Sequence, residues 1–218
     1  MPQRFDLVVF DWDGTLMDSA AAIAESIQES CRDLGLPVPD DTRARYVIGL
    51  GLHDALAHVA PSLDVADYPR MIDRYRLNFL RRDGGTRLFD GARDLLAELR
   101  EAGWLLGVAT GKSRRGLDRA LADCGLAGHF DMTRCADEGH AKPHPQMLLT
   151  IIDGLATTPQ RTLMVGDTTH DLEMAHAAGA SGLALAHGAH PREALLDAGP
   201  LALLEDLGDL RAWLRHSA

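Results

Sequence analysis

Short apolar runs, each bounded by polar or turn-forming residues, recur along the chain and predict buried β-strands. The first run covers residues 5–10 and is followed by Asp11 and Gly14. Its length and its content of Val and Phe are typical of a parallel strand that is buried on both faces. Three further runs of this kind lie at 104–109, 162–165 and 182–186.

Segments with helical periodicity separate these runs. The segment 92–102 places three leucines on one face and is followed by Gly103, which is typical of the end of a helix. Similar helical patterns cover 115–124, 145–152 and 171–178. Strands that alternate with helices in this way predict an α/β fold, namely a doubly wound parallel sheet similar to the Rossmann fold, with helices on both faces.

The region between the first two predicted strands differs because it is helical throughout. Its helical patterns lie at 20–34, 54–59 and 68–82. This region is much longer than a crossover between parallel strands, which needs about a dozen residues. We therefore predict two domains: an α/β core formed by residues 1–18 and 86–218, and an inserted α-helical cap formed by residues 19–85.

The composition is that of an ordinary globular protein with a negative charge. Of the 218 residues 46% are hydrophobic, and 22 basic against 32 acidic residues give a formal net charge of −10. This balance disfavours binding to nucleic acid or to anionic membranes. The three cysteines form no CxxC pair, and the first apolar run is too short for a signal sequence or a membrane span. We expect a cytoplasmic protein.

Two carboxylates, Asp11 and Asp13, follow the first predicted strand in the motif D-W-D-G-T at 11–15. The carboxyl end of a parallel strand is where α/β proteins bind ligands. Two acids this close can take different roles, one ionised beside a metal and the other holding a proton. The alternative is a loop pair that caps the next helix. An EF-hand loop is excluded, because Leu16 and Ala22 stand where it needs Gly and Glu.

The second predicted strand leads into Thr110 and Gly111. A hydroxyl, a glycine with an open N–H and the start of a helix are typical of a phosphate-binding loop. A Walker A loop needs four residues between its glycines, whereas three lie between Gly107 and Gly111. We therefore expect Lys112 to be a solvated or a rim lysine and not a P-loop lysine. Thr110 has the alternative role of a helix N-cap.

Lys142 lies in the sequence A-K-P-H-P at 141–145, where two prolines fix the backbone just before a helix. Taken alone, such a lysine is expected to be solvated. His140 and His144 have a spacing seen in zinc sites, but Pro143 keeps them from sharing a helix face. A zinc site is therefore not expected.

Two further carboxylates, Asp167 and Asp171, follow the predicted strand 162–165 and the turn-forming Gly166. Asp171 has the alternative role of stabilising a helix N-terminus. Asp167 together with Asp11 offers the oxygen ligands that Mg²⁺ prefers. We therefore predict a Mg²⁺ site.

In this order, the motifs D-x-D-G-T, T-G, K-P and G-D-x-x-x-D resemble those of the haloacid dehalogenase superfamily of phosphatases. The resemblance extends from Phe5 to about Ala189, and the helical insertion after the first motif is similar to that of the capped members. The segments around Lys142 and Asp167 look most like those of phosphoglycolate phosphatases.

The resemblance implies a role for each acidic residue. Asp11 would be the nucleophile that forms an aspartyl-phosphate. Asp13 would protonate the leaving alcohol and then deprotonate the hydrolytic water. The carboxylates of Asp11 and Asp167 and the backbone carbonyl of Asp13 would bind Mg²⁺. Asp171 would support the metal or hold Lys142.

The remaining motif residues would bind the phosphoryl group. Thr110 and the Gly111 N–H would contact its oxygens. Lys142 would neutralise negative charge on Asp11 and on the phosphoryl group. Dehalogenases of the superfamily lack an acid at the position of Asp13, so this acid favours phosphoryl chemistry.

The resemblance also implies a small substrate. In capped members the cap excludes water and supplies specificity, and we expect the glycine-containing segment 46–52 to contribute to it. Arg114 is expected to be an exposed arginine at a helix start, with contact to a substrate carboxylate as the alternative. His170 is expected to be a solvated loop histidine, with contact to the substrate or the cap as the alternative. The expected partner is a small phosphate monoester, with phosphoglycolate favoured, and the chain is expected to be a monomer or a weak homodimer.

Three alternatives stay open from the sequence. They are a phosphomutase of the same fold, similar to β-phosphoglucomutase, a non-catalytic module that binds a phosphate ligand, and a nucleotide-binding P-loop protein. Product analysis separates the mutase from the hydrolase. The pairing of a nucleophile with an acid, Asp11 with Asp13, disfavours the binding module, and the glycine spacing disfavours the P-loop protein.

Overall fold

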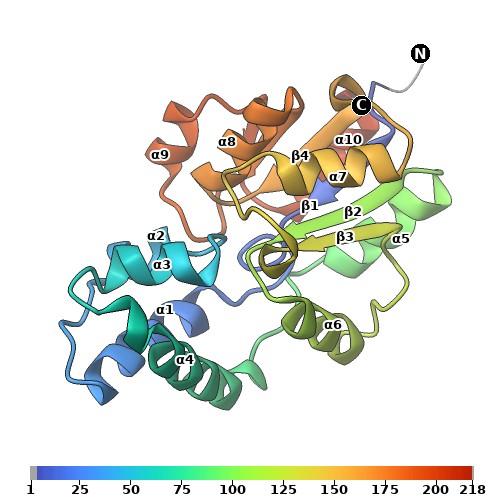
Figure 1. Cartoon of the computed structure of the whole chain (residues 1–218). Helices are drawn as coiled ribbons and strands as arrows, with labels where there is room; N and C mark the ends of the chain where they lie inside the picture. The colour runs from blue at the N-terminus through green and yellow to red at the C-terminus, as the bar shows by residue number, and fades with distance from the viewer. Residues whose placement is uncertain (1–3, 218) are drawn as a thin grey trace.

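The computed structural model of the chain describes residues 4–217, and within that range six strands form one sheet. All paired strands are parallel, in the order β3-β2-β1-β4-β5-β6 (Figure 1). The strands are β1 (Leu7–Phe10), β2 (Leu105–Thr110), β3 (Met132–Cys135), β4 (Thr162–Gly166), β5 (Ser181–Leu185) and β6 (Ala202–Leu204). The predicted doubly wound parallel sheet is confirmed. Because the chain winds outward from β1 on one side and from β4 on the other, these two strands flank the switch point of the sheet.

Helices cover both faces of this sheet. They are α5 (Ala92–Glu101), α6 (Arg114–Asp123), α7 (Gln146–Gly154), α8 (Thr169–Ala178), α9 (Arg192–Asp197) and α10 (Leu207–Ser217), with short 3₁₀ turns at Ala136–Glu138 and Pro159–Arg161. Val8 and Phe10 of β1 pack in a hydrophobic core with α5, α6 and α10. Leu7 and Val9 point to the opposite face and pack with α7 and α8. The alternation along β1 therefore joins two cores across one sheet.

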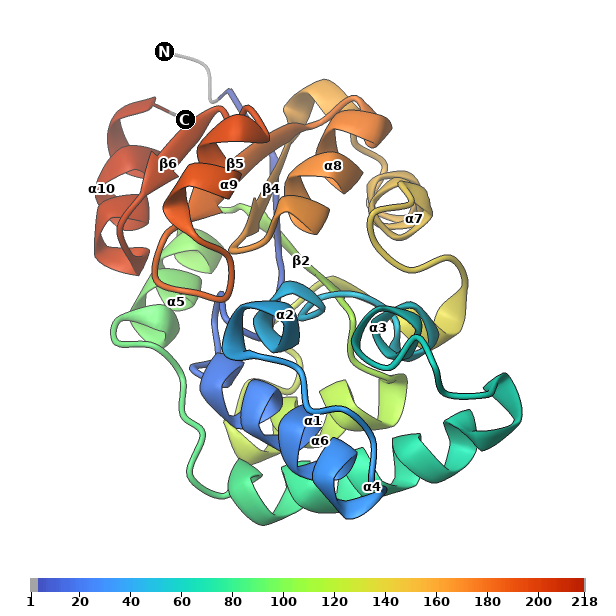
Figure 2. The same cartoon turned by 90° about the vertical axis from the view of Figure 1, so that its left-hand side faces the viewer.

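Four helices between β1 and α5 form a second group. They are α1 (Ala20–Asp33), α2 (Asp41–Tyr46), α3 (Leu52–Val59) and α4 (Tyr68–Asp83), with a 3₁₀ turn at Val65–Asp67. They share a hydrophobic cluster that includes Ile23 and Met71, and Ala189 of the α/β unit joins it. Figures 1 and 2 show this group beside the α/β unit. We call helices α1–α4 and their connections the cap; the exact boundaries 19 and 85 stay a prediction.

Two strands and three helices were not expected from the sequence. β3 has the polar sequence M-T-R-C and β6 has three residues, so neither gives a visible apolar run. The helices α2 and α9 have six residues each, which is too few to show a helical period. The helix α10 follows the last predicted strand in the chain. None of the helices within residues 4–217 is both long and apolar enough to cross a membrane.

Candidate active site

Three acidic side chains converge at the carboxyl ends of β1 and β4. Asp11 follows β1, Asp167 follows β4, and Asp171 lies in the first turn of α8. All three residues are completely buried, and one oxygen from each lies within 4.8 Å of the other two. Since β1 and β4 are neighbours in the sheet, the fold itself brings together carboxylates that are far apart in the sequence. We call these three residues the carboxylate cluster.

Lys142 supplies the positive charge of this cluster. It is completely buried, and its Nζ lies 2.6 Å from Asp11 Oδ1 and 2.7 Å from Asp171 Oδ1. Burial alone would lower the pKa of Lys142, but the charges of Asp11 and Asp171 outweigh burial and raise this pKa above its ordinary value. The lysine is therefore a permanent ammonium between two carboxylates.

Hydrogen bonds fix the other two carboxylates. Thr15 Oγ1 donates to Asp167 at 2.6 Å, and the N–H of Ala189 donates to it at 2.7 Å. Asp171 accepts from the hydroxyl of Thr168 at 2.7 Å and from its N–H at 3.1 Å, as in a capping box at the start of α8. None of these three donors was predicted from the sequence. Thr15 could have been found, because it belongs to the D-x-D-G-T motif.

Glycines make room for the carboxylates. Gly14 has a φ of +89°, and a Cβ there would lie 2.2 Å from Asp167 Oδ2. A Cβ on Gly188 would lie 2.1 Å from the same oxygen, and one on Gly166 would lie 2.2 Å from Asp171 Cγ. These distances are far below van der Waals contact. A side chain at any of the three positions would displace a carboxylate.

The carboxylate cluster has more negative charge than Lys142 can balance. Burial, together with the charges of Asp171 and Asp13, raises the pKa of Asp11 to about 7, although Lys142 acts in the opposite direction. Burial and the neighbouring carboxylates also raise the pKa of Asp167 well above its ordinary value. Asp11 Oδ2 is buried and has no hydrogen-bond partner among the described residues. An unpartnered carboxylate oxygen beside further carboxylates suits a hard divalent cation.

Asp13 is held by groups outside the carboxylate cluster. Ser19 Oγ donates to its Oδ1 at 2.7 Å, and Lys112 Nζ lies 2.8 and 2.9 Å from its two oxygens. The same ammonium lies 4.9 Å from the ring centroid of Phe79 in α4, and only 12% of the Lys112 side chain is exposed. The expectation of a solvated lysine is wrong, because Asp13 provides a buried counter-charge that is distant in the sequence.

Thr110 and Gly111, at the end of β2, lie under the loop that connects α2 and α3. Thr110 is completely buried, and its Oγ1 accepts from the N–H of Lys112 at 3.2 Å. A Cβ on Gly111 would lie 2.6 Å from the carbonyl oxygens of Gly49 and Leu50. The cap loop therefore packs directly on the predicted phosphate-binding loop, which leaves no room for a side chain at Gly111.

Tyr46 connects the same cap loop to the core. Its carbonyl oxygen lies 2.7 Å from His170 Nε2 and 3.0 Å from His190 Nε2, and its ring stacks on His190 with centroids 5.3 Å apart. The Nδ1 of His190 accepts from the N–H of Thr169, so its Nε2 donates to Tyr46. Burial lowers the pKa of His170 to about 4. The favoured interpretation of His170 as a solvated histidine is wrong, and the alternative of contact with the cap is confirmed.

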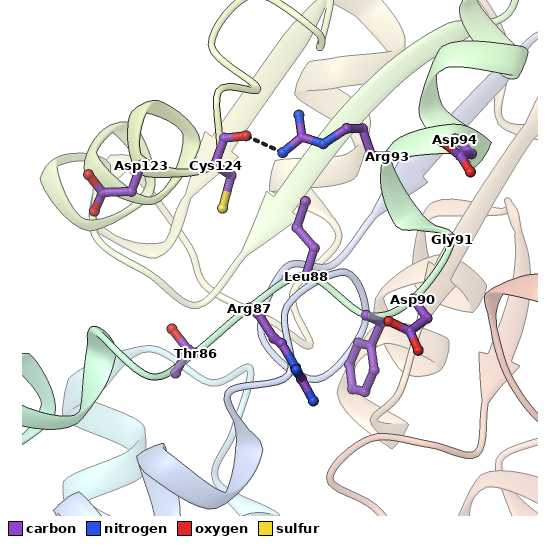
Figure 3. A pocket seen from close by; sticks show the side chains of 10 residues that line it. Thr86, Arg87, Leu88, Asp90, Gly91, Arg93, Asp94, Asp123 and Cys124 are labelled. Carbon is purple, nitrogen blue, oxygen red and sulfur yellow. Dashed lines mark hydrogen bonds between the residues drawn. The ribbon is translucent and has the colours of Figure 1, made fainter.

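Two surface hollows lie along the segment that connects α4 to α5. The first, of about 440 Å³, is lined by residues 86–91 and by parts of α5 and α6 (Figure 3). Arg93 crosses this hollow and donates to the carbonyl of Cys124 at 2.6 Å. The second hollow has a volume of about 460 Å³. It is lined by part of the same connecting segment and by the start of α10. Neither is lined by a predicted site residue, so these hollows are separate from the carboxylate cluster.

Comparison with known proteins identifies the family. Residues 8–185 match the haloacid dehalogenase-like hydrolase family. The chain is 34% identical over 210 residues to a "Probable phosphatase IndB" of Dickeya dadantii. This alignment covers 94% of this chain and 91% of that protein. It is 30% identical over 230 residues to the phosphoglycolate phosphatase of Salmonella paratyphi A, across 93% and 90% of the two chains. The chain belongs to the haloacid dehalogenase-like hydrolase family.

Two further similarities refine this result. The tyrosine-protein kinase PtkA of Mycobacterium tuberculosis is 35% identical over 175 residues, which are 79% of this chain and 59% of that protein. The crystal structure of a hydrolase from Pseudomonas syringae matches all of both chains with a TM-score of 0.90 and 23% identity, which supports the fold. The expected resemblance and the expected enzyme class, a phosphoric monoester hydrolase, are confirmed.

Proposed function

We propose that the protein hydrolyses a small phosphate monoester through an aspartyl-phosphate formed on Asp11. One observation carries this proposal. Asp11 is a completely buried carboxylate with one oxygen on the Lys142 ammonium and the other without a hydrogen-bond partner among the residues described. A carboxylate that only stabilises a fold has its oxygens paired. A free oxygen beside an ammonium is instead suited to bind a metal or to attack phosphorus.

Mg²⁺ fits the carboxylate cluster. One carboxylate oxygen each of Asp11, Asp167 and Asp171 lies within 4.8 Å of the other two, and the charge of these carboxylates exceeds that of Lys142. We assign the ion to the carboxylates of Asp11 and Asp167 and to the backbone carbonyl of Asp13. Asp171 is assigned to hold Lys142, which its 2.7 Å ion pair supports. When bound, the ion neutralises negative charge on the phosphoryl group and on the carboxylates.

In the first step, the phosphoryl group passes from the substrate to Asp11. An oxygen of Asp11 bonds to phosphorus while the ester P–O bond breaks. Asp13 gives its proton to the leaving oxygen, so that the alcohol departs neutral. The ammonium of Lys142, 2.6 Å from Asp11, offsets the repulsion between the carboxylate and the incoming phosphate.

In the second step, water releases the phosphate. Asp13, now a carboxylate, takes a proton from a water molecule whose oxygen bonds to phosphorus. The bond between phosphorus and Asp11 breaks, which restores both side chains and frees inorganic phosphate. Thr110 and the N–H of Gly111, at the end of the neighbouring strand β2, are assigned to bind the phosphoryl oxygens in both steps.

The cap restricts the substrate to small esters. Its loop packs so closely on Gly111 that a methyl group there would overlap the carbonyls of Gly49 and Leu50. A site covered in this way excludes water and has little room for a polymer. Residues 19–85 are therefore assigned as the cap domain, and phosphoglycolate, the substrate in the name of one relative, is the substrate we favour.

The test is phosphate release from p-nitrophenyl phosphate and from a panel of metabolite monoesters, with Mg²⁺ or with EDTA. The wild type is expected to release phosphate only with the metal, and Asp11→Asn is expected to release none. Asp94→Asn is the control, because Asp94 is an exposed acid at the outer hollow. Turnover by Asp11→Asn, or full activity in EDTA, contradicts the proposal.

A further inference from the structure

Lys112 places a second ammonium in the site, next to the proposed acid. The chain contains two lysines, Lys112 and Lys142, and both lie here. Lys142 is paired with Asp11 and Asp171, on the side where phosphorus is attacked. Lys112 is paired with Asp13, the residue proposed above as the acid for the leaving alcohol. The two ammonium groups therefore serve different ends of the substrate.

The position of Lys112 defines which part of the leaving alcohol it can reach. Its Nζ lies 2.8 and 2.9 Å from the two oxygens of Asp13. An ester oxygen that is hydrogen-bonded to Asp13 lies within about 5.5 Å of this ammonium. A substituent one carbon away from the ester oxygen is therefore within reach of Lys112.

The ammonium of Lys112 has little water around it and few partners. The side chain is 12% exposed, and the ring of Phe79 in α4 covers it at 4.9 Å. Asp13 contacts it with both oxygens, and one of these must turn to the ester oxygen when substrate binds. A poorly hydrated ammonium that gives up a partner is stabilised by a new anion in its place.

Other cations near the site are already engaged. Arg114, two residues further along the chain, pairs with Glu138 at 2.9 Å and with Asp118 at 3.1 Å. Arg93 in the outer hollow donates to Cys124 (Figure 3), and that hollow is also lined by three aspartates. Neither arginine is placed to serve the leaving alcohol.

We infer that Lys112 binds a carboxylate carried by the leaving alcohol, one carbon from the ester oxygen. The substrates are then phosphate esters of small 2-hydroxy acids. This inference rests on the proposed function, because it takes Asp13 as the acid that faces the leaving group.

The first test compares two esters that differ only in this group. Phosphoglycolate carries a carboxylate where 2-hydroxyethyl phosphate carries a neutral CH₂OH. The wild type is expected to favour phosphoglycolate in kcat/KM by roughly 10- to 100-fold, the worth of a hydrogen bond between charged groups. Lys112→Met should abolish this preference, mainly through KM for phosphoglycolate. Arg115→Met, an exposed cation nearby, should retain it.

The outcomes separate the inference from the proposed function. If the wild type turns over neither ester nor p-nitrophenyl phosphate, the proposed function fails. If it hydrolyses both esters equally well, only the role of Lys112 as a carboxylate-binding residue fails. If Lys112→Met slows both esters by the same factor, Lys112 only positions Asp13, and the inference is overturned.

The second test is independent of turnover and uses the small number of lysines. In Asp11→Asn, acetylation by an amine-reactive reagent is followed at Lys112 by peptide mass spectrometry, with the same protein without added phosphate ester as the reference. Phosphoglycolate should protect Lys112 at least several-fold better than 2-hydroxyethyl phosphate at the same concentration. Equal protection by the two esters, or no protection by either, overturns the inference.

Discussion

Removing the proposed nucleophile is expected to stabilise the metal-free protein. Asp11 is completely buried beside Asp167 and Asp171, and burial is the main reason that its pKa rises from 3.8 to about 7. Asparagine has nearly the same size and can accept from Lys142 as the carboxylate does. The substitution Asp11→Asn thus removes a buried charge that destabilises the folded state, and it leaves the packing intact.

The size of this effect follows from the pKa difference between the folded and unfolded states. A carboxyl with a raised pKa in the folded state destabilises that state when it ionises. For Asp11 the penalty is absent below pH 3.8 and complete above about pH 7, so stability falls as the pH rises through this window. Three pKa units correspond to about 4 kcal/mol at pH 8 and to about 1.6 kcal/mol at pH 5.

Thermal unfolding in EDTA measures this difference. At pH 8, Asp11→Asn should unfold about 10 °C above the wild type, and the gap should narrow at pH 5. Asp94→Asn, which changes an exposed acid, should unfold with the wild type. Adding Mg²⁺ should stabilise the wild type more than Asp11→Asn. A variant that is less stable than the wild type in EDTA at pH 8 would refute the reasoning. A difference in unfolding temperature that does not change with pH would refute it as well.

Three other substitutions give distinct results. Lys142→Met leaves buried carboxylates without their cation, so we expect a loss of about 3–5 kcal/mol in the free energy of unfolding and no measurable turnover; wild-type stability in urea denaturation would contradict this. Gly111→Ala overlaps the Gly49 carbonyl, so the cap loop has to move and kcat/KM should fall on the order of 100-fold, and unchanged steady-state kinetics would count against a closed cap loop. Asp13→Ala should lower kcat/KM, which reports the first step, far more for alkyl phosphates than for p-nitrophenyl phosphate, because nitrophenolate leaves without a proton; equal losses in kcat/KM would exclude Asp13 as the acid.

The fold could be predicted because its signals are local. Each central strand is a short apolar run, and the four predicted strands agree with β1, β2, β4 and β5 within two residues at each end. The strands β3 and β6 lie at the two edges of the sheet and are partly exposed. Because a partly exposed strand needs fewer apolar residues, neither strand gave such a signal. The ends of β1 and β4 carry Asp11 and Asp167, and a parallel sheet brings such ends together whatever their separation in the chain.

The parts of the site that depend on the cap could not be predicted. Lys112 is a surface lysine by every local criterion, and only the folded chain brings it to Asp13 and under Phe79. His170 is likewise buried by contact with Tyr46, which belongs to another group of helices. No local pattern records how a cap docks on a core, because that contact is set by the tertiary packing of both.

The most direct measurement of the central claim identifies the residue that carries phosphate during turnover. Asp13→Asn should accumulate this species with p-nitrophenyl phosphate, because the first step needs no acid while the second lacks its base. Acid quenching and borohydride reduction convert an aspartyl-phosphate to homoserine, which peptide mass spectrometry locates. We expect homoserine at position 11 in an amount that matches the burst of nitrophenol. A burst with Asp11 unmodified, or with the reduced residue elsewhere in the chain, would contradict the assignment of Asp11 as the nucleophile.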